Sequence, residues 1–234
     1  MTAKLLKNGT VLSWDDATNL IKVLPKSSIL IQDDRITAIY EDGEKQDVPK
    51  DTEIVDVEGK IVSPGFINTH VHAWQTAYRT LGPDIFVVQY FLWLSQMSPA
   101  TQAFTPDDLY VSSLEGYLDA LNGGTTTLVD HAHNNWAKDI MRVGYDAAVD
   151  SGARVWWCYD VTPRDNFSIP EQWDVYRGIA KDHQKERSTV ELGLSYDGHA
   201  HLSDEEFKNG LKMVKELDLK AITTHHIGGP WPGE

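Results

Sequence analysis

Short apolar runs separated by turn signals make up the first 60 residues. Asn8-Gly9 is a turn signal within the apolar run 5–12. Runs 28–31 and 35–40 flank Gln32-Asp33-Asp34, which is a hairpin pattern, and run 54–57 precedes a further turn signal at Glu58-Gly59. We expect residues 1–60 to form a small β domain, and none of its residues cluster in a pattern that suggests chemistry.

After residue 60 the pattern changes to strands that alternate with helices. Thr105 can cap a helix that has Pro106 at its first position and Gly123-Gly124 at its end. Ser203 and Glu206 form a capping box before another helix. Further helices are predicted over about 137–150, closed by Gly152, and after Ser168. The predicted strands cover residues 61–72, 125–130, 154–161, 189–196 and 219–226.

Five strands in strict alternation with at least four helices predict a parallel sheet with right-handed crossovers. In such folds the chemistry gathers at the carboxyl ends of the strands. The histidines follow this rule, since only His183 lies elsewhere. Those at or after strand ends are His70 and His72, His131 and His133, His199 and His201, and His225 and His226.

His70 and His72 end the first of these strands. Side chains two residues apart on a strand point to the same side, so the two imidazoles project together while Val71 faces away. Neutral imidazoles at this spacing can chelate one divalent metal ion. Two histidines at this spacing also arise by chance, and the six others at strand ends favour the metal site.

Composition narrows the class of protein. The 41% hydrophobic and 24% charged residues are typical of a globular chain with one substantial core. A net charge of −14 argues against nucleic acid or an anionic membrane as partner. A single cysteine, Cys158, excludes an intramolecular disulfide, and no apolar run is long enough to span a bilayer. We therefore expect a cytoplasmic protein with a small-molecule substrate, and a homo-oligomer is compatible with the sequence.

Several motifs resemble the amidohydrolase superfamily. They are PGFINTHVH at 64–72, then Trp74-Gln75-Thr76 and Arg79, and GGTTTLVDH at 123–131. The pattern is most similar to the group of cytosine deaminase, guanine deaminase and triazine hydrolase. This resemblance implies an α/β fold of the (β/α)8 TIM-barrel type, with a small β-sandwich built from sequence on both sides of the barrel. Residues 1–60 would belong to the sandwich, and residues 61–234 would supply the first five β/α units.

The resemblance also implies a metal site. In that group the HxH pair and a histidine at the end of strand five hold one zinc or iron ion, which matches His70, His72 and either His225 or His226. We prefer His225 because it directly ends the strand. Binuclear relatives carry a lysine at the end of strand four, and the stretch 190–198 has none, which favours a single metal ion, zinc or alternatively iron.

Substrate-contacting positions are implied at the same strand ends. Asp197, His199 and His201 lie where the group places a substrate-contacting histidine. The remaining candidates for substrate contact are His131 and His133, Gln75 and Arg79, and Trp74 as an aromatic wall for a flat heterocycle. A polar loop contact for the histidines, a surface salt bridge for Arg79 and simple packing for Trp74 are equal alternatives.

The expected activity is metal-assisted hydrolysis of a C–N or C–halide bond, not a peptide bond, in a small heterocyclic or amide substrate. Two departures from the family pattern qualify this expectation. Gly228 and Gly229 stand where many deaminases carry a proton-shuttling glutamate, which favours amide cleavage or decarboxylation as an alternative. Nothing matches strands six to eight, so we expect a fragment; a degenerate relative that binds a ligand without turnover is the other alternative.

Overall fold

The computed structural model describes residues 2–185, 188–197 and 202–225. The chain divides into two compact units, Met1–Gly65 and Phe66–Glu234. The sequence placed the border at residue 60. The short strand β5 (Ile61–Val62) accounts for the difference, because it pairs in parallel with β1 of the first unit.

The first unit is a five-stranded sheet. Its order is β3 (Arg35–Tyr40), β2 (Leu20–Gln32), β1 (Ala3–Asp15) and β4 (Glu53–Asp56), with β5 also paired to β1. The first three strands are antiparallel neighbours, whereas β4 and β5 run parallel to β1. Three apolar side chains form its buried cluster: Val11, Leu24 and Ile29.

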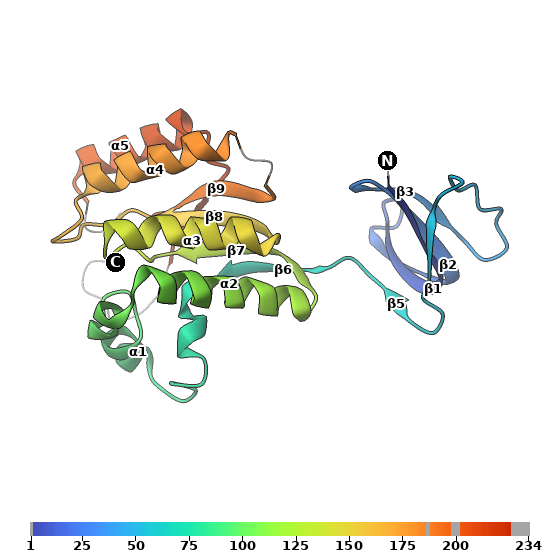
Figure 1. The fold of residues 1–234 in the computed structure, drawn as a ribbon, viewed down its shortest axis with the longest axis horizontal. Helices are drawn as coiled ribbons and strands as arrows, with labels where there is room; N and C mark the ends of the chain where they lie inside the picture. Colours follow the sequence, from blue (N-terminus) through green and yellow to red (C-terminus); the bar gives the residue numbers. More distant parts are fainter. Residues whose placement is uncertain (1, 186–187, 198–201, 226–234) are drawn as a thin grey trace. The chain divides into compact units, whose positions relative to one another are not determined.

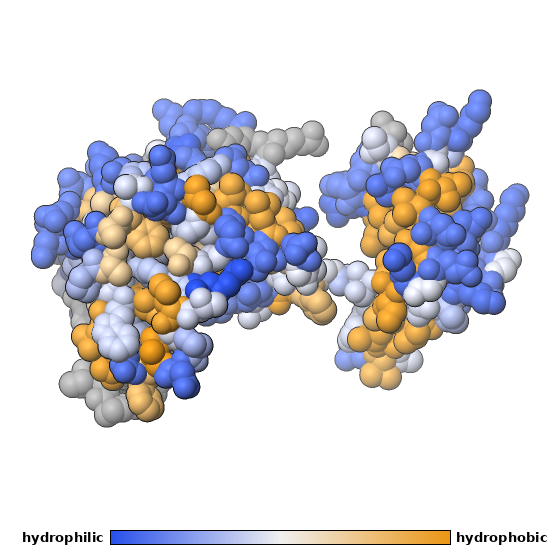
Figure 2. Space-filling model, turned by 60° about the horizontal axis from the view of Figure 1, so that its bottom comes forward, coloured by the Kyte–Doolittle hydropathy of each residue, from blue (hydrophilic) through white to orange (hydrophobic). Residues whose placement is uncertain are grey.

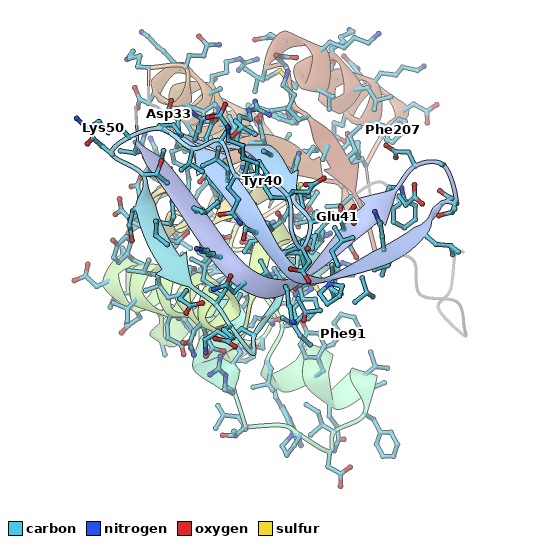
Figure 3. The ribbon with its side chains drawn as sticks, turned by 90° about the vertical axis from the view of Figure 1, so that its right-hand side faces the viewer. Asp33, Tyr40, Glu41, Lys50, Phe91 and Phe207 are labelled. Carbon is cyan, nitrogen blue, oxygen red and sulfur yellow. The ribbon has the colours of Figure 1, made fainter. Side chains whose placement is uncertain are left out.

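Two of the three predicted turns in this unit are confirmed. Asp33, with φ of 52°, lies in the turn between β2 and β3, while Tyr40 and Glu41 lie at the far end of β3 (Figure 3). Gly59 turns the chain before β5 with φ of 73°. The predicted Asn8-Gly9 turn is wrong. Strand β1 continues through these residues, and the register shift around Gly9 shows that they form a β-bulge.

The second unit is a parallel sheet whose strands follow one another in chain order, which confirms the predicted alternation (Figure 1). Its strands are β6 (Phe66–Val71), β7 (Thr125–Ala132), β8 (Arg154–Asp160), β9 (Val190–Ser195) and β10 (Ala221–Thr223). The intervening helices are α2 (Pro106–Asn122), α3 (Lys138–Ser151), α4 (Ile169–His183) and α5 (Asp204–Glu216).

Helix ends follow the local signals. Thr105 accepts a hydrogen bond from the backbone of Asp108 at the start of α2, and Ser203 does the same for Glu206 at the start of α5. Gly152 ends α3 in the left-handed conformation, with φ of 69°. The segment between β6 and α2 holds three short helices that the sequence pattern did not define: η1 (Ala73–Tyr78), α1 (Val87–Trp93) and η2 (Pro99–Ala103).

Helices α3, α4 and α5 are joined side by side by ion pairs (Figure 1). Arg142 of α3 contacts Asp182 of α4, and Arg177 of α4 contacts Glu216 of α5. Beneath them, the strands contribute a buried core that includes the single cysteine, Cys158, in the middle of β8. Burial raises the pKa of this thiol to about 12.

Some large apolar side chains remain exposed on each unit. Figure 2 shows part of this hydrophobic surface in orange. On the first unit these residues include Trp14, Leu20, Ile21, Val23, Ile36 and Ile54, and on the second they include Phe66, Ile67, Phe86, Val88, Leu92 and Ile222. In the described part of the chain, no helix combines the length and the apolar character that crossing a membrane requires.

Candidate metal centre

The strand register brings distant histidines together at the carboxyl end of the sheet. Val71 pairs with Asp130, so the next residues along, His72 and His131, are neighbours. On the opposite side, Thr223 pairs with Ser195, and continuing this register places His225 opposite Asp197. The contacts follow this geometry and enclose a compact group of imidazole rings contributed by β6, β7 and the end of β10.

One imidazole nitrogen of the cluster lies close to two others. The Nε2 atom of His225 lies 3.2 Å from Nε2 of His70 and 3.2 Å from Nε2 of His72. Nitrogen ligands of a tetrahedral zinc ion, at their usual bond length, are separated by about 3.3 Å. The spacing of Nε2 of His225 from each of the other two nitrogens therefore fits two ligands of one small divalent metal ion.

The partners of the opposite ring nitrogens fix two of the tautomers. Nδ1 of His72 lies 2.8 Å from the backbone carbonyl oxygen of His131, which can only accept a hydrogen bond. Nδ1 of His225 lies 2.6 Å from Oδ2 of Asp197, which is also an acceptor. Both Nδ1 atoms therefore carry the proton, and both Nε2 atoms present lone pairs to each other. A cation between them would remove this repulsion.

The environment favours the neutral form of His70 and His72, which is the form that can bind a metal ion. Burial lowers the pKa of His72 to about 3. Burial also lowers the pKa of His70, and the neighbouring His225 and His131 lower it further. Burial alone would raise the pKa of Asp197, but hydrogen bonds from His131 and His225 outweigh it and hold this pKa well below its ordinary range.

His131 is an alternative ligand by distance. One nitrogen each from His70, His131 and His225 can be chosen so that all three lie within 4.8 Å of one another. However, Nε2 of His131 lies 3.0 Å from Oδ2 of Asp197, and the side chain is fully buried. Nε2 of His72, by contrast, lies 3.2 Å from Nε2 of His225 and has no carboxylate partner among the described residues.

His133 and Trp74 pack next to His72. His133 stacks on His72, with ring centroids 4.0 Å apart, and its Nδ1 accepts a hydrogen bond of 2.8 Å from Nε1 of Trp74. Trp74 is buried and makes edge contacts with Tyr78, Phe104 and Trp136. Of the two roles left open by the sequence, the structure gives Trp74 the packing role.

Gln75 and Arg79 lie on the segment that follows His72. Gln75 donates hydrogen bonds to the hydroxyl of Tyr90 (3.0 Å) and to the carbonyl oxygen of Leu94 (2.8 Å), so it holds α1 against η1. Arg79 forms ion pairs with two carboxylates of α2, at 2.9 Å to Asp119 and 3.4 Å to Glu115. These contacts correspond to the surface salt bridge that was the alternative role for Arg79.

Tyr90 is a site neighbour that the sequence did not reveal. Its pKa is raised by burial and, to a smaller extent, by the charge of Asp197, and its hydroxyl is hydrogen-bonded to Gln75. In the sequence it lies within an apolar aromatic run that carries no distinguishing signal. The predicted site residues His199, His201 and His226 lie outside the described residues.

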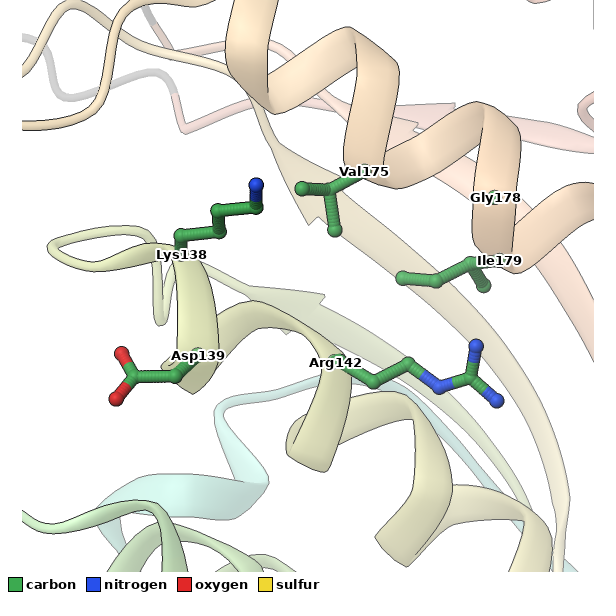
Figure 4. Close-up of a pocket in the computed structure, with 6 residues that line it drawn as sticks. All are labelled: Lys138, Asp139, Arg142, Val175, Gly178 and Ile179. Atoms are coloured by element: carbon green, nitrogen blue, oxygen red, sulfur yellow. The ribbon is translucent and has the colours of Figure 1, made fainter.

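A separate groove opens between α3 and α4 (Figure 4). None of its lining residues is a histidine, and Arg142 there is already paired with Asp146 and Asp182. The chemistry of the described chain is therefore concentrated at the histidine cluster. The lining residues are Lys138, Asp139, Arg142, Val175, Gly178 and Ile179.

Known proteins resemble the chain in sequence and in structure. Residues 61–231 match the model of the amidohydrolase family. A 5'-deoxyadenosine deaminase of Methanosarcina mazei is 32% identical over 156 residues, which are 65% of this chain and 34% of that protein. Atrazine chlorohydrolase from Arthrobacter aurescens TC1, solved with zinc, superposes with a TM-score of 0.75 at 21% identity, covering 96% of this chain and 53% of that one. Guanine deaminase from C. acetobutylicum gives a TM-score of 0.74 at 16% identity, with coverage of 96% and 53%.

The parallel β/α sheet of the second unit matches the fold of these structures. The chain belongs to the amidohydrolase family, which confirms the resemblance found in the sequence. It spans about half the length of these solved structures and about a third of the curated relative.

Proposed function

We propose that this chain carries the metal-binding part of a hydrolase that cleaves a C–N or C–halide bond of a small heterocyclic or amide substrate. The observation that supports this most directly is that Nε2 of His225 lies 3.2 Å from Nε2 of His70 and 3.2 Å from Nε2 of His72. The carboxylate and carbonyl partners of the Nδ1 atoms explain why these lone pairs point inward.

Zinc is the metal we propose, with iron as the alternative. Three neutral imidazoles with an open fourth position are typical of catalytic zinc sites, and imidazole also suits Fe²⁺. A structural neighbour, atrazine chlorohydrolase, was solved with zinc. When bound, such an ion lowers the pKa of a coordinated water molecule and supplies hydroxide near neutral pH.

The chain's own residues would hold this ion and shape its surroundings. His70, His72 and His225 supply the nitrogen ligands, and the stacked ring of His133 limits how far His72 can rotate. Tyr90, fixed by Gln75, lies on the segment that follows the ligand pair and offers an aromatic ring with a polar hydroxyl. Such a group suits a flat heterocycle that needs one hydrogen-bond partner.

The leaving group differs among the similar proteins. The sequence relatives include a 5'-deoxyadenosine deaminase, and the structural neighbours include guanine deaminase and atrazine chlorohydrolase. An amine must be protonated as it leaves, whereas chloride leaves as an anion without a proton. Glycines at 228 and 229, where many deaminases carry a glutamate, therefore favour chloride or another leaving group that needs no proton from that position.

Metal binding tests the ligand assignment. We expect the purified chain to bind one Zn²⁺ per molecule, measured by calorimetric titration and by elemental mass spectrometry. His70→Ala, His72→Ala and His225→Ala should each weaken binding by at least about 100-fold, because each removes one of three ligands. His183→Ala is the matched control, since His183 contacts Tyr145 on the helical side and should leave affinity unchanged.

Full zinc occupancy in His72→Ala, combined with loss in a His131→Ala variant, would contradict the ligand set. A screen for release of ammonia or chloride from 5'-deoxyadenosine, guanine and atrazine then tests the reaction class. Chloride release without ammonia release would support the leaving group argued from positions 228 and 229.

We also propose that the first unit belongs to a β-sandwich. Its small sheet keeps large apolar side chains exposed, including Ile21, Ile36 and Ile54. A second β layer would bury such a surface, since sandwiches pack two sheets face to face.

A further inference from the structure

We propose that Asp197 is a positioning residue that selects the tautomer of His225 and directs its Nε2 toward the metal. This inference rests on the proposed function, because it takes His225 to be a metal ligand. It replaces the role expected from the sequence, in which Asp197 contacts the substrate.

Both carboxylate oxygens of Asp197 accept hydrogen bonds from its neighbours. Oδ1 accepts from the backbone N–H of His225 at 2.7 Å and, more weakly, from the hydroxyl of Thr224 at 3.5 Å. Oδ2 accepts from Nδ1 of His225 at 2.6 Å and from Nε2 of His131 at 3.0 Å. The carboxylate therefore accepts hydrogen bonds from both the backbone and the ring of His225, and these bonds fix the position of the ring as well as its tautomer.

The pairing of β9 with β10 positions Asp197 beside His225. The backbone of Tyr196 still follows the ladder and donates to Thr223. One step further, the side chain of Asp197 takes over from the backbone as acceptor for the N–H of His225. The pair thus stands where the β9–β10 ladder ends, and the ladder itself sets the distance between carboxylate and imidazole.

His131 holds the carboxylate from the opposite side. Its ring is fully buried, and its Nδ1 has no hydrogen-bond partner among the described residues, so its bond to Asp197 is the polar contact that orients it. Among the described residues, Asp197 is also the one carboxylate hydrogen-bonded to histidines of the cluster. Its negative charge would offset part of the charge of a divalent ion held by neutral ligands.

An asparagine at this position gives a sharp test, because it keeps the shape but cannot accept on both sides. If the amide oxygen stays with the backbone N–H of His225, the amide NH2 group faces Nδ1 of His225 and donates to it. The proton of His225 then moves to Nε2, and the lone pair that would bind the metal is lost. Asp197→Asn should therefore weaken metal binding as much as Asp197→Ala.

The matched control is Asp160→Asn. Asp160 is a buried carboxylate at the end of the adjacent strand β8, and its hydrogen bonds go to Asn135 and Thr162 rather than to a histidine. We expect Asp197→Asn and Asp197→Ala to raise the Zn²⁺ dissociation constant about 10- to 100-fold, and Asp160→Asn to change it less than about 3-fold. Circular dichroism verifies that each variant is folded. If the alanine variant does not fold, the zinc affinity of the asparagine variant alone tests the role of Asp197.

Imidazole nitrogen NMR of the metal-free, ¹⁵N-labelled full chain reads the tautomer directly. We expect His225 to be protonated at Nδ1 in the parent and at Nε2 in Asp197→Asn. Unchanged zinc affinity and an unchanged tautomer in both Asp197 variants would overturn the inference. So would two zinc ions in the parent and one in the variants, since Asp197 would then be a ligand itself. Full zinc binding by His225→Ala would instead refute the ligand set of the proposed function, while the tautomer measurement still tests the role of Asp197.

Discussion

Two buried carboxyl groups, Asp130 and Asp160, lie near the ends of strands β7 and β8. Burial raises the pKa of Asp130 to about 6 and that of Asp160 to about 7, and the charge of Asp197 adds to the effect on Asp160. Asp160 is fully buried, and its Oδ1 has no hydrogen-bond partner among the described residues. The nearby cation of Arg164 opposes the shift only partly.

These shifts predict how stability depends on pH. Because the folded pKa of Asp160 lies above the unfolded value, its contribution is greatest below about pH 4 and is lost as pH rises through about 7. Asp160→Asn should remove this loss. The unfolding free energy of the variant minus that of the parent should increase from pH 5 to pH 8 by roughly 2.5 kcal/mol. Urea unfolding at both pH values measures it, and a pH-independent difference would show that Asp160 is ionised throughout.

At this scale the sequence predicted which residue types meet but not what orients them. His70, His72 and His225 could be proposed because strand ends of a parallel sheet meet at one edge. Their hydrogen-bond partners could not, because the carbonyl oxygen of His131 is 59 residues from His72 and Asp197 is 28 residues from His225. Such contacts depend on the register between strands, which local patterns do not determine.

Among the elements, α2 packs directly on η1, the segment that follows β6 and His72. Gly116 in α2 faces η1, where an added Cβ would lie 2.5 Å from Oγ1 of Thr76 and 2.9 Å from the carbonyl oxygen of Ala73. Ala73 follows His72 in the chain. The missing side chain at position 116 therefore lets the helix support the end of β6 at close range.

Gly116→Ala should lower the unfolding free energy by about 1–3 kcal/mol, because the gain in helix propensity is smaller than the cost of overpacking. It should also weaken zinc binding by displacing the chain next to His72. Gly178→Ala in α4 is the matched control. No atom lies within 4 Å of its added Cβ, so the substitution should stabilise the chain by about 0.5–1 kcal/mol. Thermal unfolding compares the two, and equal stabilisation by both would show that α2 can move away from η1.

Predictability differed between elements for a physical reason. Helices α2 and α5 begin at Thr105 and Ser203 as predicted, since capping depends on residues three apart. The bulge at Gly9 was read as a turn because Asn-Gly suits both, and only pairing with β2 distinguishes them. Helix α1 has no buried residue, so its apolar sequence has no amphipathic pattern to reveal it.

For the whole molecule, the order of strands and helices along the sequence was the basis for predicting the fold. Alternation beyond residue 60 predicted a parallel sheet in chain order, and this is what the second unit contains. The border between the units was less accessible, because two residues of β5 decide it through their pairing with β1. A pairing of this length leaves almost no signal in the sequence.

The buried thiol of Cys158 can serve as a labelling probe for opening of the sheet. The sulfur lies against Gly193 of the neighbouring strand, and its raised pKa suppresses the reactive thiolate, so alkylation requires the sheet to separate. Zinc that binds only the folded chain should slow labelling about 100-fold at 100 times its dissociation constant. His72→Ala should label at a zinc-independent rate, and mass spectrometry of iodoacetamide-treated samples measures both. A parent rate unaffected by zinc would mean that β8 and β9 separate while the metal stays bound. If zinc does slow the labelling, the alkylation rate of this one sulfur atom measures how much bound metal stabilises the fold, and no substrate is needed.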